Sequence, residues 1–372
     1  MPKEDDCNFQ EHFAKSLDRR KFLRLGCYGL LASAGWASLA SAQIPLAPRI
    51  NKPFSFAYVS DTHLITGTPD NYVLLQESQL FLQDTVRAIN KANPDFVIFG
   101  GDQVDMLGTN NANWGLFGDI VDTLTAPWNF VLGEHDLIAP PSKNRLPFDK
   151  MSMYGIDWRT NKVKTTTPYW SWLPLPQVQI LALDTSQQGS DTGFVSKEQL
   201  DWLQAMLNLD KETFTIVVSH HPLLAPPPFD RPDFFNNYLL PQAADVREIL
   251  SKAPNVAMAL SDHIHVSAIQ KENHIWYVSN PSLDVYPCAW RLFKVTESGI
   301  TVETKPVRFP ALVKKARTDI ASSPFAQRYN PRKPGLYAEV LEGKESDQNA
   351  FLAFNSKEAL AVKPTKEKKE KK

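Results

Sequence analysis

Six histidines of this chain stand directly after apolar runs, in segments that also carry an aspartate or a second histidine. They are His63, His135, His220, His221, His263 and His265. Imidazole and carboxylate groups in one site suit manganese, iron or zinc, and argue against calcium or magnesium alone. Because open α/β sheets bind ligands at the carboxyl ends of their strands, the position of these residues is as informative as their type. The sequence therefore predicts a metal site at several strand ends.

Five short segments hold these groups. They read SDTH (60–63), GGDQVD (100–105), GEHD (133–136), SHHP (219–222) and SDHIH (261–265). In Asp61-x-His63 and His263-x-His265 the paired groups are two residues apart. An extended segment would place both on one face, whereas a tight turn could aim them at two neighbouring ions. Two ions roughly 3.5–4 Å apart would clamp a phosphoryl group and activate a bridging water.

The elements that must position these segments alternate between two periodicities. Apolar runs typical of buried strands end at the first three segments, and helical spacing separates them. The expected strands cover 54–61, 95–102 and 128–133, and the expected helices cover 74–93 and 116–124. Continuous apolar strands that alternate with helices predict a sheet covered on both faces.

The second part of the chain adds a hairpin and further strands and helices. We expect a hairpin leading into a strand at 169–184, a helix at 196–209 with Ser196 as N-cap, strands at 214–220 and 256–262, a helix at 242–253, and strands with a hairpin at 274–280 and 291–307. This pattern predicts a half rich in parallel strands, followed by a more antiparallel half. Two sheets packed face to face, with helices outside, would fit it.

The five segments, in this order, resemble the calcineurin-like metallophosphoesterase family. The family pattern is DxH, GDxxD, GNHD, a His before x-Pro, and GHxH, and the likeness covers roughly residues 54–307. The resemblance implies an α/β fold in the form of a four-layer α/β/β/α sandwich, with two stacked mixed sheets flanked by helices. We expect this domain to occupy residues 53–307.

The resemblance also implies a role for each matched residue. Two divalent or trivalent ions (manganese, iron or zinc) are expected, with Asp102 bridging them. One ion would be held by Asp61, His63 and His265, and the other by Glu134, His220 and His263. A metal-bridging hydroxide would attack phosphorus in line. His135 would stabilise the transition-state charge and could protonate the leaving oxygen, oriented by Asp136 or Asp105.

Two positions depart from the family pattern, and a third departs from one branch of the family. Glu134 replaces a neutral amide ligand, so it either adds a negative charge to the metal site or swings away to pair with a cation. Asp262 replaces a glycine, as a turn residue or as a carboxylate that orients His263. Asp105 stands where purple acid phosphatases carry a tyrosine, so no Fe(III)-tyrosinate centre is expected.

Other residues near the segments have less certain roles. His221 is a candidate for substrate contact or for support of the ligands, and equally for a structural role. Arg231 lies in the Pro- and aromatic-rich loop 222–242 and could reach a phosphate. That loop could form a stiff wall that stacks a ring, or it could pack on its own aromatics. His274 lies within an expected strand, and we interpret it as structural.

The N-terminus has the order of a signal peptide at residues 1–42. The pair Arg19-Arg20 precedes an Ala- and Gly-rich apolar stretch that ends at Ala40-Ser41-Ala42. The paired arginines resemble a twin-arginine signal, which predicts contact with the twin-arginine export machinery and a periplasmic or extracellular location. A membrane anchor or a basic arm is the alternative. Cleavage after position 42 would leave Cys288 as the one cysteine of the three.

The charge balance and the C-terminal composition limit the functions that the sequence allows. A net charge of -1 provides no overall field that would attract nucleic acid. Residues 308–372 are expected to form an extension whose Lys/Glu-rich end, 363–372, is disordered. We expect a phosphohydrolase acting on a small-molecule phosphate ester, either a monoester or a diester such as a cyclic nucleotide. The alternative is a weak or inert metal- or phosphate-binding protein, made so by Glu134 and Asp262.

Overall fold

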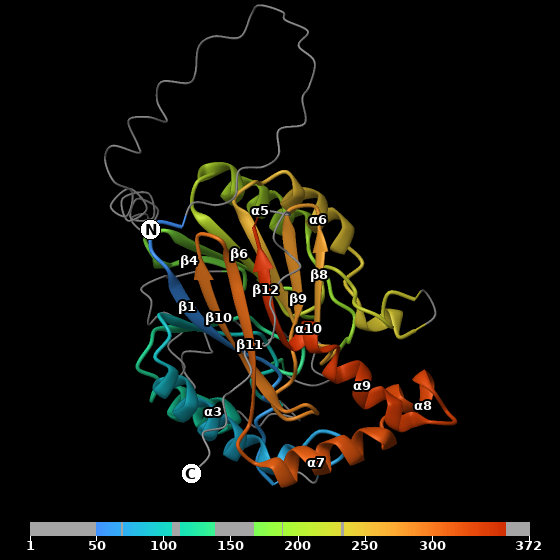
Figure 1. Cartoon of the computed structure of the whole chain (residues 1–372). Coiled ribbons are helices and arrows are strands. Elements are labelled where there is room, and N and C mark those ends of the chain that lie inside the picture. Colours follow the sequence, from blue (N-terminus) through green and yellow to red (C-terminus); the bar gives the residue numbers. More distant parts are fainter. Residues whose placement is uncertain are drawn as a thin grey trace, which may run out of the picture. The chain divides into compact units, whose positions relative to one another are not determined.

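Two mixed sheets of six strands each pack face to face, with helices on the outer face of each sheet (Figure 1). The sequence predicted this four-layer arrangement, and the computed structural model confirms it. The structure describes residues 50–67, 70–105, 112–137, 167–187, 189–231 and 234–354. The predicted signal segment 1–42 and the predicted disordered tail 363–372 lie outside these ranges.

The first sheet has the strand order β12-β11-β10-β1-β2-β3. Its strands are β1 (Phe54–Val59), β2 (Phe96–Phe99), β3 (Trp128–Phe130), β10 (Ala289–Thr296), β11 (Gly299–Pro306) and β12 (Asn349–Ala353). The neighbours β1, β2 and β3 pair in parallel, whereas β10 pairs antiparallel with β1. The parallel strands therefore bring the segments SDTH, GGDQVD and GEHD to the same edge of this sheet.

The second sheet has the strand order β4-β5-β6-β7-β9-β8. Its strands are β4 (Trp170–Leu175), β5 (Val178–Leu183), β6 (Phe214–Ser219), β7 (Val256–Ser261), β8 (Ala268–Glu272) and β9 (Ile275–Ser279). The four central strands are parallel, and only β4 and β8 run antiparallel to their neighbours. The expected division into a parallel half and an antiparallel half is therefore wrong. Each sheet has parallel strands, and the late hairpin β10–β11 returns to the first sheet.

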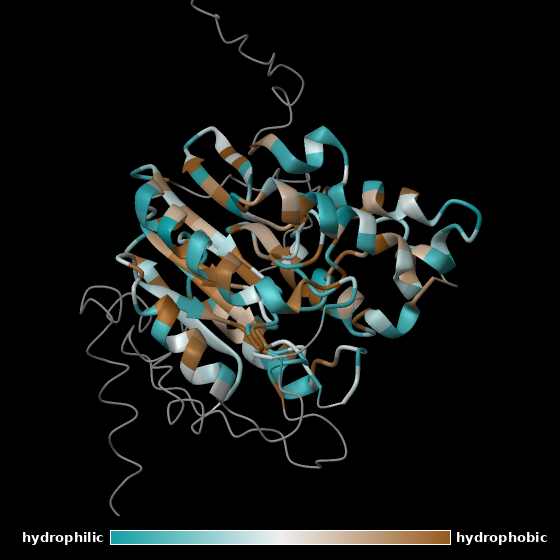
Figure 2. Ribbon diagram, turned by 90° about the horizontal axis from the view of Figure 1, so that it is seen from below, coloured by the Kyte–Doolittle hydropathy of each residue, from teal (hydrophilic) through white to brown (hydrophobic). Residues whose placement is uncertain are grey.

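Alternation along the strands divides the core into layers. Phe56 and Ile98 of the first sheet point toward the second sheet, where Ile216 and Met258 meet them. The Phe56 ring stacks on Phe96 and Phe293, with centroids 5.1 and 4.6 Å apart. Each fully buried side chain of this kind contributes about 1.5–3 kcal/mol to folding. Figure 2 shows the same pattern, with hydrophobic strands inside and hydrophilic faces on the helices.

Helices cover the other face of each sheet. The first sheet carries α3 (Ser78–Ala92) and α4 (Ala112–Val121), and the second carries α5 (Lys197–Leu209) and α6 (Ala243–Ser251). The Ser196 side chain accepts a hydrogen bond from the backbone N–H of Gln199, as expected for an N-cap. Short 3₁₀ helices are η1 (Leu75–Glu77), η4 (Asn236–Tyr238), η5 (Ile320–Ser322) and η6 (Pro334–Leu336). In the described part of the chain, no helix is both long enough and apolar enough to cross a bilayer.

The segment after β11 is an integral part of the fold, although the sequence pattern suggested no element there. It forms α7 (Pro310–Asp319), α8 (Pro324–Tyr329), α9 (Tyr337–Glu342), α10 (Glu345–Gln348) and β12. Tyr337 and Leu341 are buried in the same core cluster as α3, and β12 completes the first sheet by pairing with β11. The buried Arg291 guanidinium donates to the carbonyls of Ser279 and Asp347, which attaches α10 to the sheets. Cys288 is buried and forms no disulfide within the described ranges.

Candidate functional site

The five segments meet where the carboxyl ends of β1, β2, β3, β6 and β7 adjoin, and their chain turns sharply there. Five of the predicted ligands have positive φ angles: Asp61 (49°), His63 (35°), Asp102 (51°), His263 (66°) and His265 (57°). Such angles cost a non-glycine residue free energy and cluster at functional sites. The segments are therefore not extended, and the alternative of tight turns describes them.

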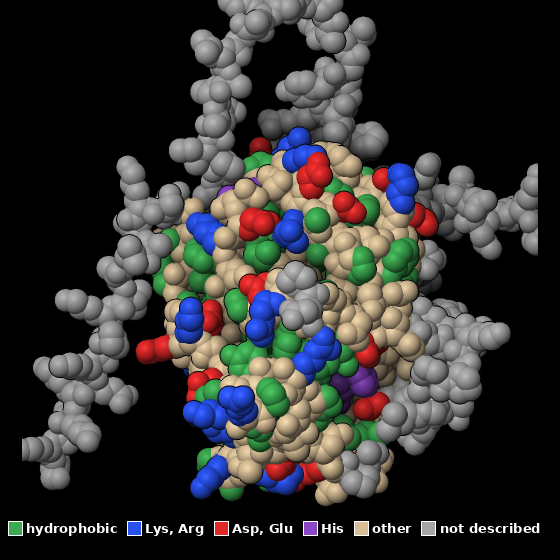
Figure 3. Space-filling model, turned by 90° about the vertical axis from the view of Figure 1, so that its right-hand side faces the viewer, with side chains coloured by type: hydrophobic (Ala, Val, Ile, Leu, Met, Phe, Trp, Pro, Cys, Tyr) green, Lys and Arg blue, Asp and Glu red, His purple; other side chains and the backbone are tan. Residues whose placement is uncertain are grey.

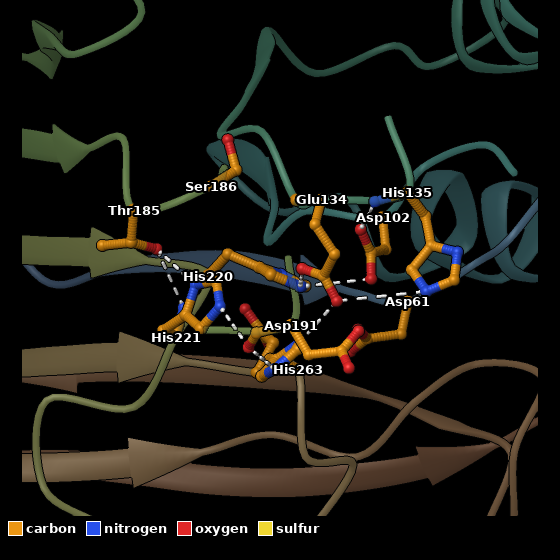
Figure 4. Close-up of polar contacts among 12 residues, drawn as sticks. Asp61, Asp102, Glu134, His135, Thr185, Ser186, Asp191, His220, His221 and His263 are labelled. Atoms are coloured by element: carbon orange, nitrogen blue, oxygen red, sulfur yellow. Dashed lines mark hydrogen bonds and ion pairs between the residues drawn. The ribbon is translucent and has the colours of Figure 1, made fainter. Parts of the chain in front are cut away.

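One group of side chains is tightly packed and buried; we call it the Glu134 cluster. It consists of Asp102, Glu134, His220 and His263, whose candidate ligand atoms all lie within 4.8 Å of one another. His220 Nε2 lies 3.2 Å from Asp102 Oδ2 and 3.1 Å from Glu134 Oε2. His263 Nδ1 lies 2.8 Å from Glu134 Oε1. Figure 4 shows Glu134 between these rings, so it points into the cluster.

A second group, which we call the Asp61 cluster, adjoins the first. It consists of Asp61, His63 and His265, again with ligand atoms within 4.8 Å of one another. His265 Nε2 lies 3.4 Å from Asp61 Oδ1, and His63 Nε2 lies 3.9 Å from Asp102 Oδ2. Asp102 thus stands between the two clusters. His263 and His265 belong to different clusters, whereas Asp61 and His63 belong to the same one.

The orientation of two rings is fixed by backbone carbonyls. His220 Nδ1 lies 3.0 Å from the Gly100 carbonyl oxygen, and His263 Nε2 lies 3.0 Å from the Asp191 carbonyl oxygen. Each of these nitrogens must donate, so the other nitrogen is the one that faces the carboxylates and is placed to bind a metal ion. This is how proteins orient histidine ligands of a metal ion.

Several of the converging atoms have no hydrogen-bond partner although they are buried. They are both carboxylate oxygens of Asp61, Nε2 of His63, Oε2 of Glu134, Nε2 of His220 and Nδ1 of His263. Buried polar atoms are rarely left without a partner, and here imidazole nitrogens and carboxylate oxygens converge on the same small volume. Cations placed among these atoms would satisfy them. The residues of the two clusters therefore form a candidate dinuclear metal site.

Electrostatics favours the charge states that metal ligands need at Glu134 and His63, but not at His220. Burial opposes ionisation of Glu134, but His263 and His220 outweigh it and hold the pKa of this carboxyl well below its usual range. Burial and the nearby His135 lower the pKa of His63 to about 4. Burial also acts to lower the pKa of His220, but Asp102 and Glu134 raise it well above the ordinary value. A metal ion that binds at His220 must therefore displace a proton.

Close packing around Asp102 explains the glycines beside it. Gly101 has a φ of 115°, and a Cβ there would collide with the His220 ring. A Cβ on Gly133 would collide with the Asp102 carboxylate and backbone. Only glycine allows the two loops to approach each other this closely.

The structure separates the two carboxylates that were expected to orient His135. Asp105 Oδ1 lies 3.5 Å from His135 Nδ1, so Asp105 can hold the ring. Asp136 instead accepts hydrogen bonds from the backbone N–H groups of Val104 (3.0 Å) and Gly133 (2.9 Å). Asp136 therefore ties the second loop to the third, and the expectation of a catalytic contact with His135 is not met. Asp136, which is next to His135 in the sequence, faces the backbone, whereas Asp105, which is distant in the sequence, faces the His135 ring.

Asp262 has a different role from either of those expected. The left-handed residues of its turn are His263 and His265. The Asp262 carboxylate is fully buried and accepts a hydrogen bond of 2.5 Å from the Tyr58 hydroxyl on β1. Burial and then Asp61 raise the pKa of Asp262 well above its usual value. Asp262 thus joins the two sheets beneath the site.

The less certain candidates lie outside the two clusters. His221 is fully buried, with Nδ1 2.8 Å from Thr185 Oγ1 and its ring 4.2 Å from that of His263, so it supports a predicted ligand. Arg231 is exposed and stacks over Phe234, 5.1 Å from the ring centroid, instead of reaching toward the clusters. His274 Nε2 contacts the Ala253 carbonyl oxygen at 3.0 Å, in agreement with a structural role.

A cavity of about 270 Å³ opens beside both clusters, and part of its wall was missed by the sequence analysis. Its lining includes Asp191, Tyr72 and Tyr238, together with Phe325 and Tyr337 from the C-terminal segment. Within the described part of the loop 222–242, the aromatics pack on one another, whereas stacking on a ligand ring stays a prediction. Tyr238 of this loop lines the cavity and stacks on His263 at 5.5 Å. Figure 3 shows the face on which histidine and acidic side chains reach the surface beside hydrophobic ones.

Two stacked mixed sheets with adjoining carboxylate and histidine clusters at their strand ends are the framework of a metal-dependent enzyme. The family model of calcineurin-like phosphoesterases matches residues 54–267, which is more than half of the chain. The chain therefore belongs to the calcineurin-like phosphoesterase family, and by family it is a metallophosphoesterase.

Individual relatives are distant. The Arcobacter nitrofigilis protein named "probable glycerophosphodiester phosphodiesterase" is 29% identical over 166 residues, which cover 44% of this chain and 55% of that protein. The chain thus spans about half the length of this relative. The 3',5'-cyclic adenosine monophosphate phosphodiesterase of Haemophilus influenzae is 23% identical over 67% of this chain and 89% of its own length. A dimetal phosphatase from Danio rerio has the same fold, with a TM-score of 0.54 and 14% identity over 68% of this chain and 96% of that chain.

Proposed function

We propose that this protein is a metal-dependent phosphodiesterase that hydrolyses a small-molecule phosphate diester. The observation that carries the proposal is the pair of adjoining clusters, with Asp102 between them and with buried carboxylate oxygens and imidazole nitrogens that converge. Both relatives described above are named as phosphodiesterases, which supports a diester as the substrate.

The chain's own residues hold and orient the reacting groups in this proposal. Asp61, His63 and His265 would hold one ion, and Glu134, His220 and His263 the other, with Asp102 contacting both. When bound, two such ions supply Lewis acidity toward the phosphoryl oxygens and activate a water molecule. The manganese, iron or zinc expected from the sequence remains part of the proposal.

His135 is placed to handle the charge and the proton of the leaving group. Its side chain is 40% exposed and lines the cavity, and its backbone N–H donates to Asp102 Oδ1 at 2.9 Å. Partial burial acts to lower the pKa of His135, but Asp102, Asp105 and Glu134 raise it well above its ordinary value. A protonated His135 at this place beside the cavity would stabilise negative charge on the phosphoryl group and protonate the leaving alkoxide.

The alternative of an inert scaffold depended on Glu134 and Asp262. Glu134 lies among the ligand atoms and contacts His220 and His263, so it keeps an oxygen where the family pattern has an amide. Asp262 is occupied by Tyr58 and displaces none of the clustered side chains. The geometry therefore favours an active site.

The test uses the purified chain with manganese or iron added and with bound metal counted. We expect turnover of bis(p-nitrophenyl) phosphate, with a kcat/KM above that for p-nitrophenyl phosphate. Two metals per chain without turnover of either compound would contradict the proposal. Faster turnover of the monoester would refute the preference for a diester.

We also propose that the protein is exported by the twin-arginine machinery to the periplasm or the outside of the cell. The support is the sequence pattern at residues 1–42, above all Arg19-Arg20. A reporter fused behind residues 1–42 should appear in the periplasmic fraction, and replacement of both arginines by lysine should retain it in the cytoplasm. Export that survives this replacement would exclude the twin-arginine route.

A further inference from the structure

A hydrogen bond beneath the site joins the two sheets at a position where the chain departs from the family pattern. Asp262 follows β7 of the second sheet, and its carboxylate accepts from the hydroxyl of Tyr58 on β1 of the first sheet, at 2.5 Å. Both side chains are buried. The glycine of the family pattern has no side chain that could accept this hydrogen bond.

Gly100 lies against the Tyr58–Asp262 contact and fits there because it has no side chain. A Cβ at position 100 would collide with the Asp262 carboxylate and with the Tyr58 hydroxyl. The contact therefore fills the space beside the end of β2, two residues before Asp102. Because buried groups are close-packed, a shift of the Asp262 side chain would also shift the loop that carries the shared ligand.

Two hydrogen bonds connect this contact to His220. The Asp262 N–H donates to the His220 carbonyl oxygen at 2.8 Å, and His220 Nδ1 donates to the Gly100 carbonyl oxygen at 3.0 Å. His220 is thus held at its backbone by Asp262 and at its ring by Gly100. His263 follows Asp262 directly, with a φ of 66°. The contact is therefore linked to both histidines of the Glu134 cluster.

The Glu134 cluster depends on the spacing of the two sheets more than the Asp61 cluster does. Its carboxylates, Asp102 and Glu134, follow strands of the first sheet, whereas its histidines, His220 and His263, follow strands of the second. In the Asp61 cluster, two of the three ligands stand in one segment after β1, residues 60–63. A change in sheet spacing should therefore disturb the Glu134 cluster first.

We propose that Tyr58 and Asp262 are positioning residues of the metal site, because their hydrogen bond sets the separation at which the carboxylates of the Glu134 cluster meet its histidines. Partners outside the ligands typically change metal affinity by about 10–100-fold. Loss of the contact weakens the ion of the Glu134 cluster and leaves the ion of the Asp61 cluster nearly unchanged. The inference rests on the metal site of the proposed function, but not on its substrate.

Manganese binding to the full chain measures this effect without any substrate. Equilibrium dialysis against a series of free manganese concentrations gives a dissociation constant for each of the two ions. In Asp262→Gly, which inserts the glycine of the family pattern, the tighter constant should rise about 10–100-fold, whereas the weaker one should stay within about threefold. Equal weakening of both ions, or no change in either, would overturn the positioning role.

Conservative variants distinguish this role from a general loss of stability. Asp262→Asn keeps an oxygen that can accept from Tyr58, so the tighter constant should stay within about threefold of the parent value. Tyr58→Phe keeps the ring but removes the donor, so that constant should rise about tenfold. Tyr277→Phe is the matched control, because it removes a buried hydroxyl from β9 of the second sheet, and it should leave both constants unchanged.

Two results with these variants would contradict the role of the hydrogen bond. Manganese binding by Tyr58→Phe that equals binding by the parent chain would show that the donor has no part in positioning. Weakening in Asp262→Asn as large as in Asp262→Gly would show that the side-chain oxygen facing Tyr58 is not what matters.

Turnover of bis(p-nitrophenyl) phosphate separates this inference from the proposed function. Selective weakening of one ion in Asp262→Gly and Tyr58→Phe, without turnover by the parent chain, would support the positioning role and refute the phosphodiesterase. Turnover by the parent chain, with unchanged manganese binding in both variants, would do the reverse. A parent chain that bound no manganese would refute both.

Discussion

The two metal clusters are built from similar residues but are held with different rigidity. In the Glu134 cluster, the second nitrogens of His220 and His263 are fixed by the carbonyls of Gly100 and Asp191. In the Asp61 cluster, His265 is 15% exposed, and in the described part of the chain no backbone carbonyl holds its ring or that of His63. Asp61 offers two carboxylate oxygens without hydrogen-bond partners.

This difference predicts that the two clusters bind their metal ions with different affinities. Partners that fix a ligand's orientation raise the affinity for a metal, typically by 10–100-fold. The Glu134 cluster, with its extra carboxylate, should therefore bind its ion first and keep it. The Asp61 cluster should exchange its ion more readily.

The largest effect is expected from removing the group that the clusters share. Asp102→Asn should lower kcat/KM by more than about 100-fold, because both clusters lose the same charged ligand. The assay with bis(p-nitrophenyl) phosphate and metal counting checks this. Substantial turnover in this variant would refute the position of Asp102 between two ions and would make the clusters independent.

Stepwise removal of the metal ions tests whether the two clusters differ in metal affinity. Ions present at about 100 times their Kd contribute about 2.7 kcal/mol to stability. Exhaustive chelation should therefore lower Tm by about 5 to 10 °C for a domain of this size. We expect a chelator series to remove the ions in two steps, measured by metal content against Tm. Loss of both ions in one step would contradict the difference in rigidity.

A buried carboxylate that touches neither cluster tests how the Glu134 cluster is positioned. Asp136→Asn leaves either the Val104 or the Gly133 N–H without its acceptor, so stability should fall by about 1–3 kcal/mol. Urea denaturation measures the loss. An Asp105→Asn variant is the contrast, because it should lower kcat through His135 and change stability less. If Asp136→Asn were as stable as the parent chain, the tie between the loops would be unimportant.

The smallest effect is expected where this chain departs from its family. Glu134→Asn removes a charge but keeps an oxygen toward His220 and His263, so kcat should stay within about tenfold of the parent value or rise. Metal affinity at the Glu134 cluster should fall toward that of the Asp61 cluster. A complete loss of turnover with both ions retained would show that the carboxylate has a role of its own.

The parts of the fold and site that sequence could predict are those with a local signal. The apolar strands and the N-cap at Ser196 follow directly from periodicity and residue type, and the structure brings His63, Asp102 and His220 together as their place after strands implies. Parallel strands ending at one sheet edge made that convergence predictable.

The parts that could not be predicted depend on side-chain direction and on long-range packing. The backbone turn decides whether Asp105 or Asp136 faces His135. In this turn the Asp136 side chain points to the backbone and away from the His135 ring. The aromatic part of the cavity wall needs Phe325 and Tyr337, which stand in short helices without a clear apolar period. Their place beside Tyr238 arises only when the sheets have formed.

The position of β1 in the first sheet has a consequence for how the chain is made. This early strand lies in the middle of the sheet, between β2 and the late strand β10 (Ala289–Thr296). During synthesis, one edge of β1 therefore stays open until residues 289–306 have left the ribosome, and strand edges left open in this way invite aggregation. Folding that depends on such distant pairing is slow. The nascent chain should accordingly need a chaperone until its last strands arrive.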